Sequence, residues 1–147
     1  MWNPKFLVGF TDTETLKLDL DETSFKDVKD LAKKTERKFN LRGFLILRSS
    51  KDNYHVIFNR EVSWSENVSI MSHVVLATKK TKLLKWFLLQ CRREASTLRV
   101  GSKGDKRPPR IVFRSGDEAS RIMVFLDSRR QIKRFLSRHN DRTEGEK

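Results

Sequence analysis

The chain has 147 residues and a formal net charge of +13 at pH 7, with 35% charged and 37% hydrophobic residues. This length is enough for one domain whose hydrophobic core needs no disulfide support. Cys91 is the only cysteine, which excludes a disulfide within the chain and a zinc site made of several cysteines.

The beginning of the chain predicts two strands. Residues 6–10 form a short apolar segment, and residues 15–21 alternate strictly between leucines and polar residues after the first threonine. Alternation with a period of two is typical of a strand that buries one face. We therefore expect the leucines to face the core, and Lys17, Asp19 and Asp21 to share the opposite, polar face.

A helix and a β-hairpin follow. Ser24, with an aspartate three residues later, is typical of a helix N-cap, and apolar residues then recur at helical spacing. We expect a helix over residues 25–39. Two apolar segments, 43–48 and 54–60, lie on either side of the polar residues 49–53, which predicts a β-hairpin.

The middle of the chain is less regular. Residues 61–78 show no clear period, and we expect a loop there with a short strand near 74–76. Apolar residues at helical spacing predict a helix over 79–94, and residues 97–100 predict a short strand. The glycines, prolines and charges of residues 101–109 are typical of a loop.

The last part of the chain predicts another pair of strands and a final helix. The apolar segments 110–114 and 121–126 lie on either side of a Ser-Gly-Asp turn, so we expect them to pair. A helix is predicted over 128–138, with Asp127 or Ser128 at its N-cap.

Interspersed strands and helices indicate an α+β fold with one mainly antiparallel sheet and helices packed on it. The embedded β-α-β-β-α-β order is typical of RRM-like, ferredoxin-like sandwiches. No internal repeat or linker divides the chain, so we expect one domain over residues 1–139 and a polar, flexible tail over 140–147.

The excess of basic residues indicates a polyanionic partner. A net charge of +13 causes self-repulsion, and Lys and Arg that neutralise phosphates release counterions, so DNA or RNA is the expected ligand. Adaptation to solubility or habitat is the alternative explanation. No apolar stretch, 86–89 included, is long enough to span a bilayer and no signal peptide is evident, so we expect no membrane contact and a cytoplasmic location.

Asp19 and Asp21 are candidate ligands of a divalent cation. Two carboxylates on the same side of a strand repel each other unless a cation lies between them. Mg²⁺ and Mn²⁺ prefer hard oxygen ligands and commonly bind nucleotide phosphates. The alternative is a solvated acidic pair without a metal.

Candidate phosphate-binding groups lie in two later segments. His55, in the second strand of the hairpin, is suited to donate a hydrogen bond to a phosphate oxygen, or to a structural role. Arg99 ends a strand before a turn that holds Ser102 and Lys103, where backbone N–H groups beside two cations would form a phosphate cradle. An ordinary basic surface loop is the alternative.

Further basic residues form two helix faces and part of a loop, which we predict to contact a nucleic-acid backbone. The first group comprises Lys79, Lys82, Lys85, Arg92 and Arg93, together with Arg107 and Arg110. The second group comprises Arg129, Arg130, Lys133, Arg134 and Arg138 on the last helix. Solvated helix faces are the alternative.

Taken in order, these segments resemble the catalytic core of the archaeo-eukaryotic primase (primase-polymerase) superfamily. TLKLDLD is similar to the first motif of that family through Asp19 and Asp21, and KDNYHVIF is similar to its histidine motif through His55. TLRVGSKGDK resembles its basic segment through Arg99, Ser102 and Lys103. The resemblance covers residues 6–114.

The resemblance implies metal-dependent nucleotide addition on a template in DNA replication. It assigns Mg²⁺ or Mn²⁺ to Asp19 and Asp21, and the incoming triphosphate to His55, Arg99 and Lys103. The implied partners are nucleoside triphosphates, a DNA template or an RNA one, and other replication proteins.

The chain departs from the family at the third acidic residue, which usually lies between the histidine motif and the basic segment. Cys91 or Glu94 falls near that place, and Asp127 would supply the third carboxylate by another route, although a helix N-cap is the simpler interpretation of it. Two other hypotheses therefore stay open: a non-catalytic nucleic-acid-binding accessory or regulatory protein on the same fold, and a structural or ribosome-associated basic protein.

Overall fold

The computed structural model describes residues 8–103, 106–116 and 120–145. Its elements in chain order are β1 (Gly9–Asp12), β2 (Lys17–Leu20), α1 (Phe25–Phe39), β3 (Phe44–Ser50), β4 (Asn53–Phe58), α2 (Trp64–Thr78), α3 (Thr81–Arg93), β5 (Ser96–Arg99), β6 (Arg110–Ser115) and α4 (Ser120–Gly145). The fold is α+β with antiparallel sheets and helices packed on them, as the sequence predicts.

The described strands form two antiparallel sheets, whereas the sequence predicted one. Four strands pair in the order β2-β4-β3-β6, and β1 pairs with β5 in a separate two-stranded ribbon. β4 lies between β2 and β3, so β2-α1-β3 is a split β-α-β unit with the return strand of the hairpin inserted. This arrangement is compatible with an RRM-like or primase-like sandwich.

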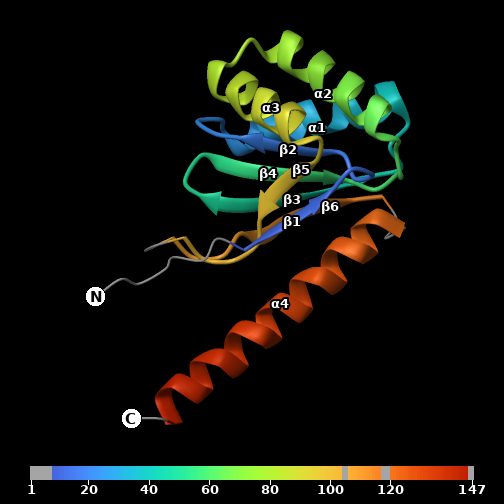
Figure 1. Cartoon of the computed structure of the whole chain (residues 1–147). Coiled ribbons are helices and arrows are strands. Elements are labelled where there is room, and N and C mark those ends of the chain that lie inside the picture. Colours follow the sequence, from blue (N-terminus) through green and yellow to red (C-terminus); the bar gives the residue numbers. More distant parts are fainter. Residues whose placement is uncertain (1–7, 104–105, 117–119, 146–147) are drawn as a thin grey trace.

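The two faces of the four-stranded sheet are covered differently. Helices α1, α2 and α3 lie over one face, while the β1–β5 ribbon and α4 lie on the other side (Figure 1). Leu16, Leu18 and Leu20 face the helical layer and are fully buried there. Because side chains alternate along a strand, the residues between these leucines face the ribbon instead of solvent.

The locally encoded elements agree with the sequence prediction. The Ser24 side chain accepts a hydrogen bond from the backbone N–H of Asp27 at 3.2 Å and caps α1, which spans the predicted residues 25–39. The predicted hairpin is β3 and β4. The predicted helix over 79–94 is α3, and the short strand over 97–100 is β5, each with slightly different ends.

The prediction of a loop with a short strand over residues 61–78 is wrong, because this segment contains α2. Ser63 caps the helix by accepting a hydrogen bond from the backbone N–H of Glu66 at 3.1 Å. The buried positions of α2 are Asn67, Ile70, Met71, Val74 and Val75, which follow a helical period. The β-branched residues of the segment had suggested a strand, and packing against the sheet outweighs that propensity.

The predicted strand over residues 121–126 is also wrong, since α4 begins at Ser120 and continues to Gly145. β6 consequently pairs with β3 and not with this segment. Ile122, Phe125 and Leu126 are buried at helical spacing, and Phe125 meets Phe10 edge to face with centroids 5.4 Å apart. The backbone of 140–145, expected to be a tail, is helical. Within the described ranges, no helix combines the length and the apolar character needed to cross a membrane.

Candidate functional site

A polar cavity of about 440 Å³ opens on the side of the sheet that carries the β1–β5 ribbon. It is lined by Val8, Gly9, Asp19, Asp21, His55, Arg93, Thr97, Arg99, Lys103 and Lys106. These residues come from both sheets, the end of α3 and the loop after β5. Five of the residues singled out from the sequence as metal or phosphate ligands therefore lie around one space.

The acidic side of the cavity is built on β2 and β4. Asp19 is the direct partner of His55 across these antiparallel strands, and Asp19 Oδ1 lies 3.5 Å from His55 Nε2. Asp21 follows two residues later and lines the same cavity. The pleat of one short strand and its neighbour thus brings two carboxyl groups and an imidazole together.

The basic side of the cavity is built on β5 and the loop that follows it. Arg99, the last residue of β5, donates through Nη1 to the carbonyl oxygens of Gly101 at 2.5 Å and Arg107 at 3.3 Å. Lys103 and Lys106 are joined by two reciprocal backbone hydrogen bonds of 3.0 and 2.9 Å. The loop is therefore folded back so that both exposed lysines line the cavity beside Arg99.

A buried lysine joins the ribbon to the four-stranded sheet. Lys17 Nζ contacts Asp12 Oδ1 at 2.5 Å, donates to Ser96 Oγ at 2.9 Å and lies 5.0 Å from the centre of the Phe10 ring. Its side chain is fully buried, and burial lowers its pKa despite the nearby Asp12 carboxylate. Because Lys17 contacts β1 and β5 at once, it holds Arg99 over the face that carries Asp19.

Burial gives Asp19 and His55 unusual proton affinities. The pKa of Asp19 rises from its ordinary value of 3.8 to about 7, mainly through burial and secondly through the negative charge of Asp21, although Arg99, Lys103 and Lys106 oppose the rise. The pKa of His55 falls from 6.5 to about 4 through burial and the nearby Arg99. At neutral pH the imidazole is therefore uncharged, and the Asp19 carboxyl exchanges its proton readily.

The carboxyl pair fits a hard divalent cation. Asp19 retains a proton partly because Asp21 is near, and a bound cation would replace that proton and relieve the repulsion. Mg²⁺ and Mn²⁺ take oxygen ligands and complete their shells with water and phosphate oxygens, so two carboxylates are a sufficient protein contribution. Within the described residues, His, Cys, Asp and Glu side chains form no group of three suited to a metal.

Asp127, the candidate third carboxylate, does not line this cavity. It lies inside α4, exposed, where its Oδ1 accepts a hydrogen bond from Arg130 at 3.1 Å. Its expected position at a strand end or N-cap was wrong because α4 begins before it, at Ser120.

Several predicted binding residues lie outside the cavity. Ser102 is exposed and is not among the lining residues. Lys79 is the C-cap of α2, and Lys82 pairs with Glu22 at 2.7 Å on the exposed surface. Lys85 and Arg92 are exposed on α3, whereas Arg93, at its end, lines the cavity. Arg107 and Arg110 line a different cavity, described below.

Four lining residues were missed by sequence reasoning: Val8, Gly9, Thr97 and Lys106. Gly9 is required by close packing, because a Cβ there would lie 2.7 Å from Thr97 Cγ2. Lys106 carried a usable signal, since it belongs to the same basic loop as Lys103. Gly9 and Thr97 lie on strands about ninety residues apart in sequence, and nothing local to either strand predicts that β1 and β5 pair.

Comparisons with models of known protein families, with curated proteins and with solved structures found no match to this chain. The functional interpretation of the cavity therefore depends on its residues and their geometry.

Proposed function

We propose that this cavity binds a nucleoside triphosphate together with Mg²⁺ or Mn²⁺, and that the chain is a primase-like nucleotidyltransferase core that adds nucleotides on a DNA template. The observation that supports this most is the joint position of Asp19, Asp21, His55, Arg99 and Lys103 around one space. A site for a divalent metal ion beside a group of basic side chains is the arrangement that a metal-bound triphosphate requires. We expect the protein to act in the cytoplasm, with other replication proteins.

The carboxyl pair has the role of holding the cation. Asp19 and Asp21 would be its protein ligands, and the cation would supply charge neutralisation at the phosphate oxygens. Asp19 has to lose its proton before it becomes a full ligand, and its pKa of about 7 makes that loss inexpensive at neutral pH.

The basic residues have the role of binding phosphate oxygens. The Arg99 guanidinium and the ammonium groups of Lys103 and Lys106 offer charge-assisted hydrogen bonds on the side of the cavity away from β4. His55 is uncharged, because its pKa is about 4, so it offers one N–H donor and one acceptor without adding a charge to the site. These groups would bind the triphosphate and stabilise the charge that develops on the leaving pyrophosphate.

The test is template-dependent extension of a DNA primer, and synthesis without a primer, in the presence of Mn²⁺. Asp19→Ala should abolish nucleotide addition, and Arg99→Ala should weaken triphosphate binding by about tenfold or more. Asp30→Ala is the matched control, because Asp30 is an exposed carboxylate on α1, across the sheet from the cavity. Equal addition by the wild type and Asp19→Ala would remove the proposal.

A non-catalytic nucleic-acid-binding protein on the same fold is the second candidate. It is favoured by the position of Asp127 on α4, which leaves two carboxylates among the described residues that line the cavity. In that case DNA binding should fall steeply with salt while Asp19→Ala leaves it unchanged, and no nucleotide should be added by the wild type.

A further inference from the structure

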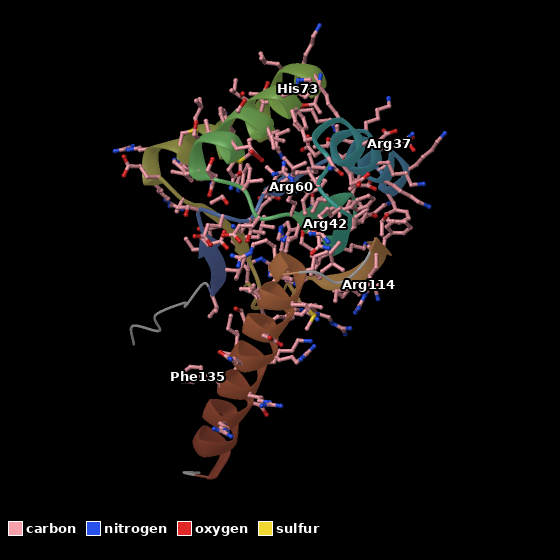
Figure 2. All side chains as sticks on the ribbon, turned by 90° about the vertical axis from the view of Figure 1, so that its right-hand side faces the viewer. Arg37, Arg42, Arg60, His73, Arg114 and Phe135 are labelled. Carbon is pink, nitrogen blue, oxygen red and sulfur yellow. The ribbon has the colours of Figure 1, made fainter. Side chains whose placement is uncertain are left out.

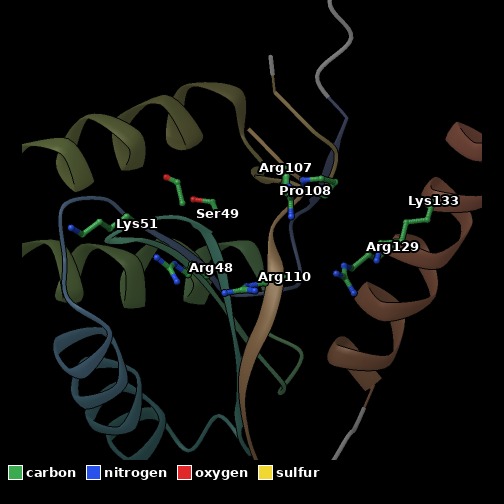
Figure 3. A pocket seen from close by; sticks show the side chains of 9 residues that line it. Arg48, Ser49, Lys51, Arg107, Pro108, Arg110, Arg129 and Lys133 are labelled. Atoms are coloured by element: carbon green, nitrogen blue, oxygen red, sulfur yellow. The ribbon is translucent and has the colours of Figure 1, made fainter. Parts of the chain in front are cut away.

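A second cavity, of about 430 Å³, lies between the β3–β4 hairpin, the start of β6 and α4 (Figure 3). It is lined by Arg48, Ser49, Ser50, Lys51, Arg107, Pro108, Arg110, Arg129 and Lys133. Six of these nine residues are cationic and none is acidic. We call this space the basic cavity.

Two of its arginines are held side by side by strand pairing. Arg48 on β3 and Arg110 on β6 are direct partners in the antiparallel register. Like charges directly opposite each other destabilise a sheet, so this pair favours an anion between or above the two guanidinium groups.

A third arginine reaches the basic cavity from α4. Arg129 donates through Nη2 to the carbonyl oxygen of Pro109 at 3.2 Å, which aims the guanidinium at the strand side of the cavity (Figure 3). Its Nε is buried without a hydrogen-bond partner among the described residues. A buried N–H of a charged group without an acceptor is costly, and a ligand oxygen would satisfy it.

These cations have no acidic partner among the residues whose side chains the structure describes. Within residues 8–103, 106–116 and 120–138, no carboxylate forms an ion pair with any of the six. By contrast, Lys82 on α3 is paired with Glu22. The basic cavity thus brings six basic side chains around one space, and no acidic residue is among its nine described lining residues.

We propose that the basic cavity binds the sugar-phosphate backbone of a nucleic-acid strand and positions that strand next to the cavity that contains Asp19. This inference rests on the proposed function and adds to it the site where the nucleic-acid strand binds. The two cavities share one loop: Arg99 lines the first and donates to the backbone of Arg107, which lines the second. None of the described residues that line the basic cavity is aromatic, so we expect them to bind the phosphates and not to distinguish the bases.

The test is the affinity for a fluorescent single-stranded DNA of about 20 nucleotides, measured by anisotropy at several salt concentrations. Arg110→Glu/Lys133→Glu should weaken binding by about tenfold or more and flatten the dependence of log affinity on log salt. The matched control is Lys34→Glu/Arg37→Glu, which makes the same charge change at two exposed residues of α1. Figure 2 labels Arg37 on this helix, which lies on the far side of the sheet from α4. The control should lose less than about threefold.

Equal losses in the two double variants would overturn the proposal, because net charge alone would then explain them. Unchanged binding in Arg110→Glu/Lys133→Glu would overturn it as well. If the reversed variant does not fold, Arg110→Gln/Lys133→Gln removes the same charges more gently and should show a smaller loss in the same direction.

Two further measurements identify the source of the phosphate and separate this proposal from the proposed function. Inorganic tripolyphosphate should compete only weakly with the DNA, and strong competition would make the basic cavity a polyphosphate site instead. Triphosphate binding in the presence of Mn²⁺ should survive in Arg110→Glu/Lys133→Glu. A chain that binds DNA at the basic cavity but adds no nucleotide would contradict the proposed enzyme and leave the strand site standing.

Discussion

Asp19 and His55 face each other across β2 and β4, and their side chains are 3.5 Å apart without forming an ion pair at neutral pH. Burial works on both groups in the same sense, since it disfavours each charged form. The pKa of the carboxyl moves up to about 7 and that of the imidazole down to about 4. The two residues thus form a nearly neutral pair beside Arg99, Lys103 and Lys106.

We expect the affinity for Mn²⁺ to depend on pH through Asp19. Because the pKa of Asp19 is about 7, the carboxylate fraction, and with it the affinity, should rise about tenfold between pH 6 and pH 8. Asp21→Asn should lower overall affinity and also shift this rise to lower pH, since the charge of Asp21 helps to raise the pKa of Asp19. Isothermal titration of the whole chain with Mn²⁺ measures both effects, and an affinity that is flat over this range would contradict the assignment.

Asp19→Asn should stabilise the fold at alkaline pH. The pKa of Asp19 is higher in the folded chain than in the unfolded chain, so the folded state binds the proton more tightly and its stability decreases as pH rises from about 4 to about 7. Asn avoids this loss. The gain in unfolding free energy should be on the order of 2 kcal/mol at pH 8, reduced by water that reaches the partly exposed side chain, and should shrink towards zero near pH 4.

Urea unfolding of the wild type and Asp19→Asn at a series of pH values measures this difference. A gain of the same size at pH 4 and pH 8 would indicate a packing effect and contradict the raised pKa. Asp30→Asn, at the exposed residue of α1, should show no such trend.

His55 should make the fold sensitive to acid. Its pKa is lower in the folded chain than in the unfolded chain, so its contribution is complete above about pH 6.5 and is lost as pH falls towards 4. His55→Gln, which cannot become charged, should remove this part of the pH dependence. NMR of the imidazole should show a neutral ring at pH 5. A titration centred near pH 6.5 would contradict the lowered pKa of His55.

The elements that sequence patterns predict well are those that local chemistry determines. Ser24 and the apolar period define α1 from within fifteen residues, and the hairpin follows from two apolar segments around a polar turn. α2 and the first part of α4 were missed because β-branched and apolar runs are compatible with either period over a short window, whereas the helix predicted over 128–138 lies within α4. The Ser63–Glu66 cap and the buried spacing Ile122, Phe125, Leu126 were the signals that pointed to helices.

Part of the cavity could be predicted because local patterns determine the strand face and the hairpin that form it. Asp19 and Asp21 share a face because of the strand period, and the hairpin return strand brings His55 beside Asp19. The burial of Lys17 could not be predicted, because alternation assigned it to a solvent-facing side. It is buried only because β1 and β5, far apart in sequence, form a ribbon over that face.

Lys17→Met should destabilise the fold and loosen the cavity. The substitution keeps most of the buried volume but leaves the Asp12 carboxylate without its cationic partner. Removing one partner of a buried ion pair lowers the unfolding free energy by about 3 kcal/mol. Asp12→Asn/Lys17→Met should recover part of this loss, because no unpaired charge then stays buried. Thermal and urea unfolding measure the unfolding free energies of the wild type, the two single variants and the double variant. A double variant less stable than Lys17→Met alone would contradict the ion-pair explanation.

Gly9→Ala should destabilise the β1–β5 ribbon through one specific contact. The added methyl group would lie 2.7 Å from Thr97 Cγ2 and 3.2 Å from the carbonyl oxygen of Leu98, and overpacking of this kind costs about 1–3 kcal/mol. Thr97→Ser removes the clashing methyl group but keeps the hydroxyl that hydrogen-bonds Thr11 at 2.7 Å. Gly9→Ala/Thr97→Ser should therefore show a favourable coupling of about 1 kcal/mol in a double-mutant cycle.

Gly101→Ala is the matched control for the ribbon, because its added methyl group would lie at an ordinary 3.4 Å from Val8 Cβ. It should change the unfolding free energy by less than about 1 kcal/mol. Because Gly9 and Thr97 both line the cavity, the clash should also weaken Mn²⁺-dependent triphosphate binding, and Thr97→Ser should restore it. Binding that stays low in Gly9→Ala/Thr97→Ser after stability recovers would mean that Gly9 serves the ligand directly and not through the packing of β1 on β5.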